Sequence, residues 1–232
     1  MRNAIPEALQ PWYCDDAGAA GKAVPNARCL DFLVKFGPTY GYFPELSKSY
    51  YICKAEDEEV ARAAFEGFGL EINYSRGQRY LGGIIGSAKM KEKWLADLVV
   101  KWVGAVETLS TVAERYPQTA YAGFTFCLQN EWQYVQQVVA DTAPFFPPLE
   151  AAIRTSFLPA LLGIPSSTEI DGEYRQLLTH SIRLGELAIH NPVDTALSVH
   201  RASLAAIRHL TASLLTDQFW FDLVLSGELG YN

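Results

Sequence analysis

The sequence predicts an α+β protein in which a segment of short strands and helices is followed by an all-α segment, with the boundary near residue 87. Short β-prone runs alternate with glycine-containing turns over the first 86 residues. After Gly86, apolar residues recur every three or four positions over long stretches, which is the period of an amphipathic helix.

The first segment is predicted to contain two helices and several short strands. Residues 11–14 form a β-prone run that ends at an Asp-Asp pair and is followed by glycines. Asn26 is the predicted N-cap of a helix that ends at Phe36, because Gly37-Pro38 cannot continue it. The remaining predictions are a strand over residues 49–53, a short helix over 56–65 and a hairpin formed by the runs 70–74 and 80–85.

The second segment is predicted to consist of amphipathic helices that prolines separate. Long helices are expected over residues 90–113 and 117–139, followed by a helix over 149–162 with a kink at Pro159 and a last helix capped by Asp194. The first two should pack as antiparallel neighbours. Their facing stripes are expected at Trp94, Leu98 and Trp102 on one helix and at Tyr121, Trp132 and Val139 on the other.

Composition narrows the possible functions. No apolar stretch reaches the roughly 20 residues that a membrane span needs, and the N-terminus has no apolar signal region, so we expect an intracellular protein, cytoplasmic or nuclear, without a membrane partner. The four cysteines lie far apart, which favours reduced thiols over a zinc site. The net charge of −7 predicts weak nucleic-acid binding by this chain alone, because such binding depends largely on basic side chains.

An adjacent carboxylate pair, Asp15 and Asp16, follows the first β-prone run. Two carboxylates at the tip of a turn offer the hard oxygen ligands that Mg²⁺ prefers. Polymerases use a pair of such ions for nucleotidyl transfer. A solvated turn fits the same residues, and an aromatic-x-Asp-Asp string arises by chance in roughly one chain in ten to twenty of this length.

The motifs that follow the aspartate pair in the sequence make its interpretation as a polymerase motif more specific. Residues 13–17 read Tyr-Cys-Asp-Asp-Ala, and residues 80–86 read Tyr-Leu-Gly-Gly-Ile-Ile-Gly. Between them, the segment of residues 37–49 carries Lys48 just before the predicted strand over residues 49–53. The motifs further along are residues 117–123, 129–133 and 182–192. Residues 13–17, 37–49 and 80–86 resemble, in this order, the Y-A-D-D box, the next palm motif and the primer-grip hairpin of reverse transcriptases from non-LTR (LINE-like) retrotransposons. Residues 117–123 and 129–133 resemble the thumb of these enzymes, and residues 182–192 resemble their R-x-G-G-L…P segment. Cysteine stands for the usual alanine of the box, and Glu186 replaces the second glycine of the last motif.

The resemblance implies a C-terminal fragment of an RNA-directed DNA polymerase. Residues 1–86 would be the end of a polymerase palm, built from β-hairpins and short helices. Residues 87–163 would be a helical thumb-like region, and residues 164–232 a helical post-thumb region. The resemblance further implies an RNA template and a DNA primer as partners, Mg²⁺ as cofactor and two-metal nucleotidyl transfer as the reaction.

The same resemblance implies roles for individual residues. Asp15 and Asp16 would be metal-binding and catalytic residues, and Lys48 would lie near the triphosphate. The residues implied to hold the nucleic-acid primer are Tyr80, Leu81, Gly82 and Gly83, the glycines permitting close backbone approach. Trp94, Trp102 and Trp132, at helical spacing, are expected in the core instead.

The chain by itself is expected to be inactive, because the fingers and the earlier palm strand with its own metal-binding aspartate would precede Met1. Two other interpretations fit the sequence. The chain is a non-catalytic helical interaction module, the folded remnant of a transposable element, or it is an unrelated acidic helical scaffold in which the Asp-Asp turn is accidental.

Overall fold

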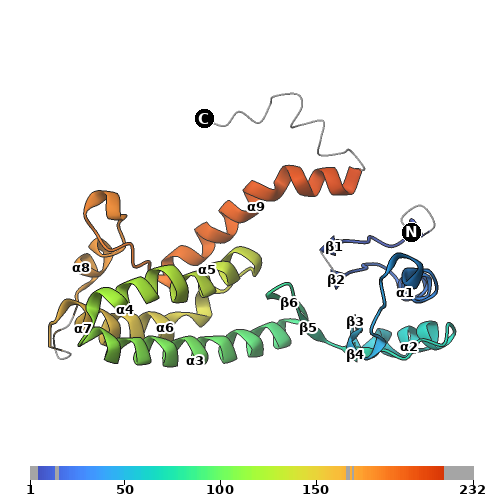
Figure 1. The fold of residues 1–232 in the computed structure, drawn as a ribbon, viewed down its shortest axis with the longest axis horizontal. Helices are drawn as coiled ribbons and strands as arrows, with labels where there is room; N and C mark the ends of the chain where they lie inside the picture. Colours follow the sequence, from blue (N-terminus) through green and yellow to red (C-terminus); the bar gives the residue numbers. More distant parts are fainter. Residues whose placement is uncertain (1–4, 14–15, 166–167, 169, 217–232) are drawn as a thin grey trace. The chain divides into compact units, whose positions relative to one another are not determined.

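Short strands in small two-stranded sheets and a majority of helices make up the protein, which confirms the α+β class. A computed structural model describes residues 5–13, 16–165, 168 and 170–216 (Figure 1). The chain divides into two compact units, Met1–Glu92 and Lys93–Asn232, and the division falls inside the long helix α3 (Ala88–Ala113). Within the described residues, no helix is both long and apolar enough to cross a membrane.

An antiparallel ribbon opens the first unit, and its first strand lies in the β-prone run of residues 11–14. β1 (Trp12–Tyr13) pairs with β2 (Asp16–Ala17), and a bridge between Leu9 and Ala20 continues the same register. Cys14 and Asp15 stand between the two strands in the sequence and lie outside the described residues. Asp16 is therefore the first described residue after the connection.

Helix α1 (Ala23–Phe36) follows the ribbon and ends where the sequence predicted. Its start was predicted wrongly, because the helix begins before Asn26 and Lys22 occupies the N-cap position. Asn26 instead donates a hydrogen bond from its side chain to the Gly21 carbonyl (3.2 Å). Beyond the helix, a 3₁₀ turn over Gly37–Tyr40 ends at Gly41, whose φ of 78° favours glycine.

A small parallel sheet forms the centre of the first unit. β3 (Tyr50–Ile52) follows a 3₁₀ turn over Leu46–Lys48, and it pairs in parallel with β4 (Asn73–Ser75). Between them lie a 3₁₀ turn over Ala55–Asp57 and α2 (Glu58–Glu66), which supplies the crossover that a parallel pair requires. The helices and the sheet bury a cluster of Ala27, Phe65 and Leu70, with Tyr51 and Tyr74 packed against it.

The predicted hairpin of residues 70–74 and 80–85 is wrong in its position. The hairpin consists of β5 (Gly77–Tyr80) and β6 (Gly83–Gly86), and its turn is Leu81-Gly82. Both turn residues have positive φ, 46° and 77°, as in the tight turns whose twist suits a hairpin. Residues 73–75 instead form β4 and pair in parallel with β3.

The second unit is helical, as predicted. After α3 come α4 (Pro117–Gly123) and α5 (Gln129–Val138), joined by a π-helical turn, and then α6 (Pro147–Ala152) and α7 (Leu158–Leu162), joined by another. The second π-helical turn, Ile153–Phe157, ends two residues before Pro159, which cannot donate a backbone hydrogen bond. The remaining elements are 3₁₀ turns over Ala143–Phe145 and Ile182–Leu184, α8 (Gly172–Leu177) and α9 (Pro192–Thr216).

The start of α9 corrects another predicted cap. The helix begins at Pro192, so Asp194 lies in its first turn instead of preceding it. The side chain of Asn191 accepts a hydrogen bond from the Val193 amide (2.9 Å). Asn191 therefore satisfies an amide that would otherwise be unpaired at this end of the helix.

Aromatic side chains form the core of the second unit. The rings of Trp102 (α3) and Trp132 (α5) lie 6.1 Å apart between centroids, and both residues are buried, which confirms them as core residues. Phe124 contacts Trp132 and stacks on Phe157 at 4.4 Å. Trp102 also contacts Phe146. This cluster joins α3, α5 and the segments around α6 and α7.

The buried stripe of α3 differs from the predicted one. Trp94 and Leu98 are half-buried, and the side chains buried in their place are Leu95 and Val99. Apolar side chains cover a wide face of this helix, so the three-to-four-residue period is compatible with two neighbouring stripes.

Candidate functional site

An open hollow of about 1020 Å³ in the first unit collects segments that are far apart in the sequence. Four of the residues implied by the sequence to act together line this hollow: Asp16, Lys48, Tyr80 and Leu81. They come from the β1–β2 ribbon, the turn before β3 and the β5–β6 hairpin. The fold thus gathers these three segments around one space.

Asp16 is positioned by backbone pairing. It pairs with Tyr13 across the ribbon, and its side chain is exposed at the start of β2. Two residues further on, the Gly18 amide donates a hydrogen bond to the Pro11 carbonyl (2.9 Å), which continues the ribbon beyond β2. The carboxylate of Asp16 is therefore presented to solvent from a paired strand. Asp15 and Cys14 lie outside the described residues.

Tyr80, at the end of β5, connects the second hairpin to the ribbon. A Cβ atom added to Gly18 would lie 3.1 Å from the Tyr80 hydroxyl oxygen and 3.0 Å from the Pro11 carbonyl oxygen. The missing side chain at Gly18 therefore makes room for the tyrosine. The segment of Asp16 and the segment of Tyr80, more than 60 residues apart in the sequence, meet at this point.

Lys48 ends the 3₁₀ turn before β3, and its side chain is 81% exposed. The backbone on both sides of it is held by the side chain of Asn73, which donates to the carbonyls of Ser47 (2.6 Å) and Ser49 (3.3 Å). The ammonium group lies 3.6 Å from the Glu45 carboxylate. An exposed pair of this kind is weak, so Lys48 is free to exchange Glu45 for an anionic ligand.

Glu45 has a second partner in the same turn. The Ser47 hydroxyl donates to its carboxylate (2.7 Å). This hydrogen bond, and after it the positive charge of Lys48, lowers the pKa of Glu45. The hollow therefore carries carboxylates of Asp16 and Glu45 and an ammonium of Lys48 on its lining.

The remaining residues implied to hold a primer lie in the β5–β6 turn. Leu81 and Gly82 are the turn itself, and Leu81 lines the hollow. Gly83 is buried where it opens β6. Of the four residues, the structure thus places Tyr80 and Leu81 on the hollow and Gly82 and Gly83 behind them in the same hairpin.

Aromatic side chains that the sequence analysis did not select also line the hollow. Tyr42, Phe43, Tyr50 and Tyr51 contribute, and Phe43 is among the most exposed large apolar side chains of the unit. The ring of Tyr42 packs on Trp12 of β1 with centroids 5.4 Å apart. The density of aromatic residues over 40–51 was a signal for this surface, but only the fold shows that they face the same space as Asp16.

The residues from 5 to 216 that the structure describes contain no group of three or more His, Cys, Asp or Glu side chains placed to hold a metal ion. Asp16 and Glu45 are the only carboxylates among the described lining residues of the hollow. Asp16 and Glu45 are therefore the two described lining residues that could contribute carboxylate oxygen ligands, and Glu45 already contacts Lys48.

A second polar constellation, in the second unit, was missed by the sequence analysis. Arg175 of α8 is buried and binds Glu150 of α6 through two hydrogen bonds of 2.7 and 2.8 Å. It also donates to the carbonyls of Ile189 (2.8 Å) and His190 (3.2 Å). The segment that it holds lies within residues 182–192, which had been selected only for their resemblance to a post-thumb motif.

Models of known protein families, curated protein sequences and solved structures were compared with the chain, and none of them matches it.

Proposed function

We propose that the first unit is the end of a polymerase palm of the non-LTR reverse-transcriptase kind, in which Asp15 and Asp16 supply carboxylate ligands to Mg²⁺ for nucleotidyl transfer. The observation that carries the proposal is the shared hollow. Asp16, Lys48 and Tyr80 come from separate segments and line one hollow, and they are residues that the resemblance assigns to one site.

The chemistry of the hollow suits this function. An exposed carboxylate next to a turn offers the oxygen ligand that Mg²⁺ requires. A lysine is a point charge that binds phosphate well, and among the described residues the ion-pair partner of Lys48 is Glu45, in a weak exposed contact. The aromatic side chains and the β5–β6 hairpin provide apolar surface beside these charges.

A two-metal centre needs more oxygen ligands than one adjacent pair of aspartates supplies. In this proposal the other ligands come from a different segment or a different polypeptide, and an RNA template and a DNA primer are the partners of the complete site. The chain by itself would then bind a divalent cation weakly and would not extend a primer.

A second candidate function is that of a non-catalytic interaction module. It is favoured by α9, along which apolar side chains remain exposed at Leu197, Leu204, Ile207 and Leu210. An amphipathic helix with an uncovered apolar stripe can dock on a partner. In this alternative the aspartate turn is a solvated feature without a role in catalysis.

Cation binding separates the two candidates. The purified chain is titrated with Mn²⁺, and the paramagnetic broadening of its backbone amide signals is followed by NMR. We expect broadening first at residues 12–17 and at Tyr80, and we expect the Asp15→Asn/Asp16→Asn variant to lose it, because asparagine keeps the shape and removes the charge.

The matched control is Glu56→Gln/Asp57→Asn, which neutralises another exposed acidic pair of the same unit before α2. This variant should keep the broadening at the ribbon. Broadening that survives the loss of Asp15 and Asp16, or that the control variant abolishes, would contradict the proposed metal site and favour the interaction module.

A further inference from the structure

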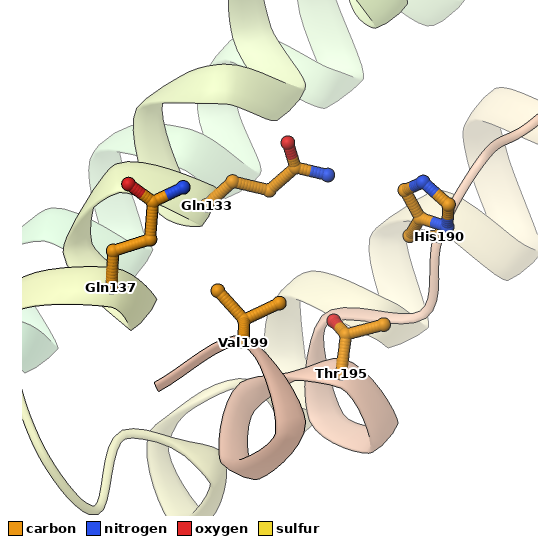
Figure 2. Close-up of a pocket in the computed structure, with 5 residues that line it drawn as sticks. All are labelled: Gln133, Gln137, His190, Thr195 and Val199. Carbon is orange, nitrogen blue, oxygen red and sulfur yellow. The ribbon is translucent and has the colours of Figure 1, made fainter. Parts of the chain in front are cut away.

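A small pocket lies in the second unit between α5, the segment before α9 and α9 itself (Figure 2). Its volume is about 200 Å³, and its lining is Gln133, Gln137, His190, Thr195 and Val199. Figure 2 shows the Gln133 carboxamide extending toward His190, with Gln137 farther along the same helix and with Thr195 and Val199 on the opposite side. α5 and α9 pack on each other, so the pocket is part of the interface between packed helices.

The wall that carries His190 is rigidly held. The His190 amide donates to the side-chain oxygen of Gln129 (3.0 Å), and the nitrogen of the same carboxamide donates to the Ala188 carbonyl (3.2 Å). Arg175 binds the His190 carbonyl from the other side. Gln136 donates to the Pro192 carbonyl (2.8 Å). The backbone is therefore fixed at several points, and the imidazole ring is left at the edge of the pocket.

The polar side chains of the pocket are uncommitted. In the part of the chain that the structure describes, no hydrogen bond engages the carboxamide of Gln133, the carboxamide of Gln137 or the imidazole of His190. Gln133 and Gln137 lie one helical turn apart, so both project from the same face of α5. Three side chains able to donate or accept hydrogen bonds thus meet at one space.

The lining is also electrically neutral at physiological pH. Burial, and after it the positive charge of Arg175, lowers the pKa of His190, which keeps its imidazole uncharged. The other lining side chains are two carboxamides, a hydroxyl and a valine. An ion would find no opposite charge here, whereas an uncharged molecule with neighbouring donors and acceptors would find partners for both.

We propose that this pocket binds the hydrogen-bonding edge of a single-ring pyrimidine base. A cavity of about 150 Å³ is enough for a benzene-sized ring, so the pocket of about 200 Å³ matches one ring. Carboxamides pair edge-on with bases through one donor and one acceptor each. Val199 offers apolar contact to the ring. The inference does not depend on the function proposed for the first unit.

The same ring chemistry has two sources, a free pyrimidine nucleoside and an unstacked base of a single strand. NMR titrations of the full chain with uridine and with a uridine hexanucleotide distinguish them. We expect saturable shifts at the side-chain amides of Gln133 and Gln137 and at His190, with a dissociation constant for uridine on the order of 1–10 mM. Tighter binding of the hexanucleotide identifies a strand as the source, and equal binding identifies the nucleoside.

Two variants make the test specific. Gln137→Met keeps the length of the side chain and removes its hydrogen bonds, and it should weaken uridine binding about five- to tenfold, the effect of one lost net hydrogen bond. Gln118→Met is the matched control, because Gln118 is an exposed glutamine of α4 outside the pocket. It should bind uridine as the unaltered chain does.

Three results would overturn the proposal. The first is the absence of saturable shifts with uridine up to about 100 mM, tenfold above the upper end of the expected dissociation constant. The second is equal binding of uridine by the Gln133→Met/Gln137→Met variant, provided that its amide spectrum shows it to be folded. The third is equal binding of ribose 5-phosphate, because that ligand lacks a base.

Discussion

Gly77 and Gly86 show how single residues set the geometry beside the candidate site. They face each other at the open end of the β5–β6 hairpin. Gly86 has a φ of +143°, and a Cβ atom added there would overlap the Gly77 Cα and the Arg76 carbonyl oxygen. A Cβ atom on Gly77 would come within 2.8 Å of the Met90 side chain. Both positions require glycine because the chain passes itself and α3 at very short range.

We predict that Gly86→Ala lowers the free energy of unfolding of the first unit by about 2–4 kcal/mol, since the side chain is strained by the backbone angle and also overlaps backbone atoms. Urea unfolding followed through NMR signals of residues 50–86 measures it. Gly104→Ala is the control, because Gly104 lies in α3 with open space around it. It should leave the first unit unchanged and stabilise α3 by about 0.5–1 kcal/mol. Equal, small effects of both substitutions would contradict the strained contact.

At the scale of elements, the ion pair of Arg175 and Glu150 connects α8, α6 and the segment that leads into α9. Both side chains are largely buried, with exposed fractions of 5% and 14%. The guanidinium also satisfies two backbone carbonyls of that segment. Arg175 is therefore one of several side chains, with Gln129 and Gln136 of α5, that hold this irregular stretch of backbone. Irregular buried backbone needs such partners, because its polar groups are costly to leave unpaired.

We predict that Arg175→Met lowers the free energy of unfolding of the second unit by about 3–5 kcal/mol, because it leaves a buried carboxylate without its counter-charge. Arg175→Met/Glu150→Leu should recover part of this loss, since it removes the unpaired charge as well. Denaturant unfolding of the single and double variants measures both effects. A double variant that is less stable than Arg175→Met would show that the ion pair is not the main contribution.

An ion pair at the surface of α1 serves as the comparison for the buried pair of Arg175 and Glu150. Lys35 and Asp31 form an i,i+4 pair on α1 at 2.8 Å, and the lysine is 62% exposed. Lys35→Met should change stability by no more than about 0.5 kcal/mol, because solvent screens such pairs.

At the scale of the whole molecule, the two units differ in the size of their cores. The first unit buries small clusters, one of Ile5, Ala8 and Cys29 and another around Phe65. Its described sheets have two strands each, so every strand has an edge without a strand partner. The second unit buries an aromatic cluster that includes Trp102 and Trp132. Apolar burial favours the second unit as the more stable one.

We predict that limited proteolysis cuts the first unit before the second and leaves a protected fragment that begins close to Ser87, where α3 starts. Local opening costs less in a unit with few buried contacts, and cleavage follows that opening. Mass spectrometry of the early fragments locates the cuts. Early cleavage between residues 90 and 140 with survival of residues 1–86 would contradict the difference in stability.

The sequence by itself determined the features that depend on local chemistry. The apolar period predicted the long helices, the prolines and glycines predicted where several of them end, and the β-prone runs predicted β3 and the ribbon at Asp16. These succeeded because backbone geometry and side-chain burial within one helix or strand follow from residues near in sequence. The core positions of Trp102 and Trp132 followed from the same period.

Only the tertiary structure decided the features that depend on distant partners. Residues 73–75 pair with β3 because α2 brings them there, so the hairpin moved to Leu81-Gly82. Asp16, Lys48 and Tyr80 share a hollow only because three segments meet, and Arg175 finds Glu150 25 residues away. A pairing between distant segments is selected by the packing of the whole unit, and no local period records it.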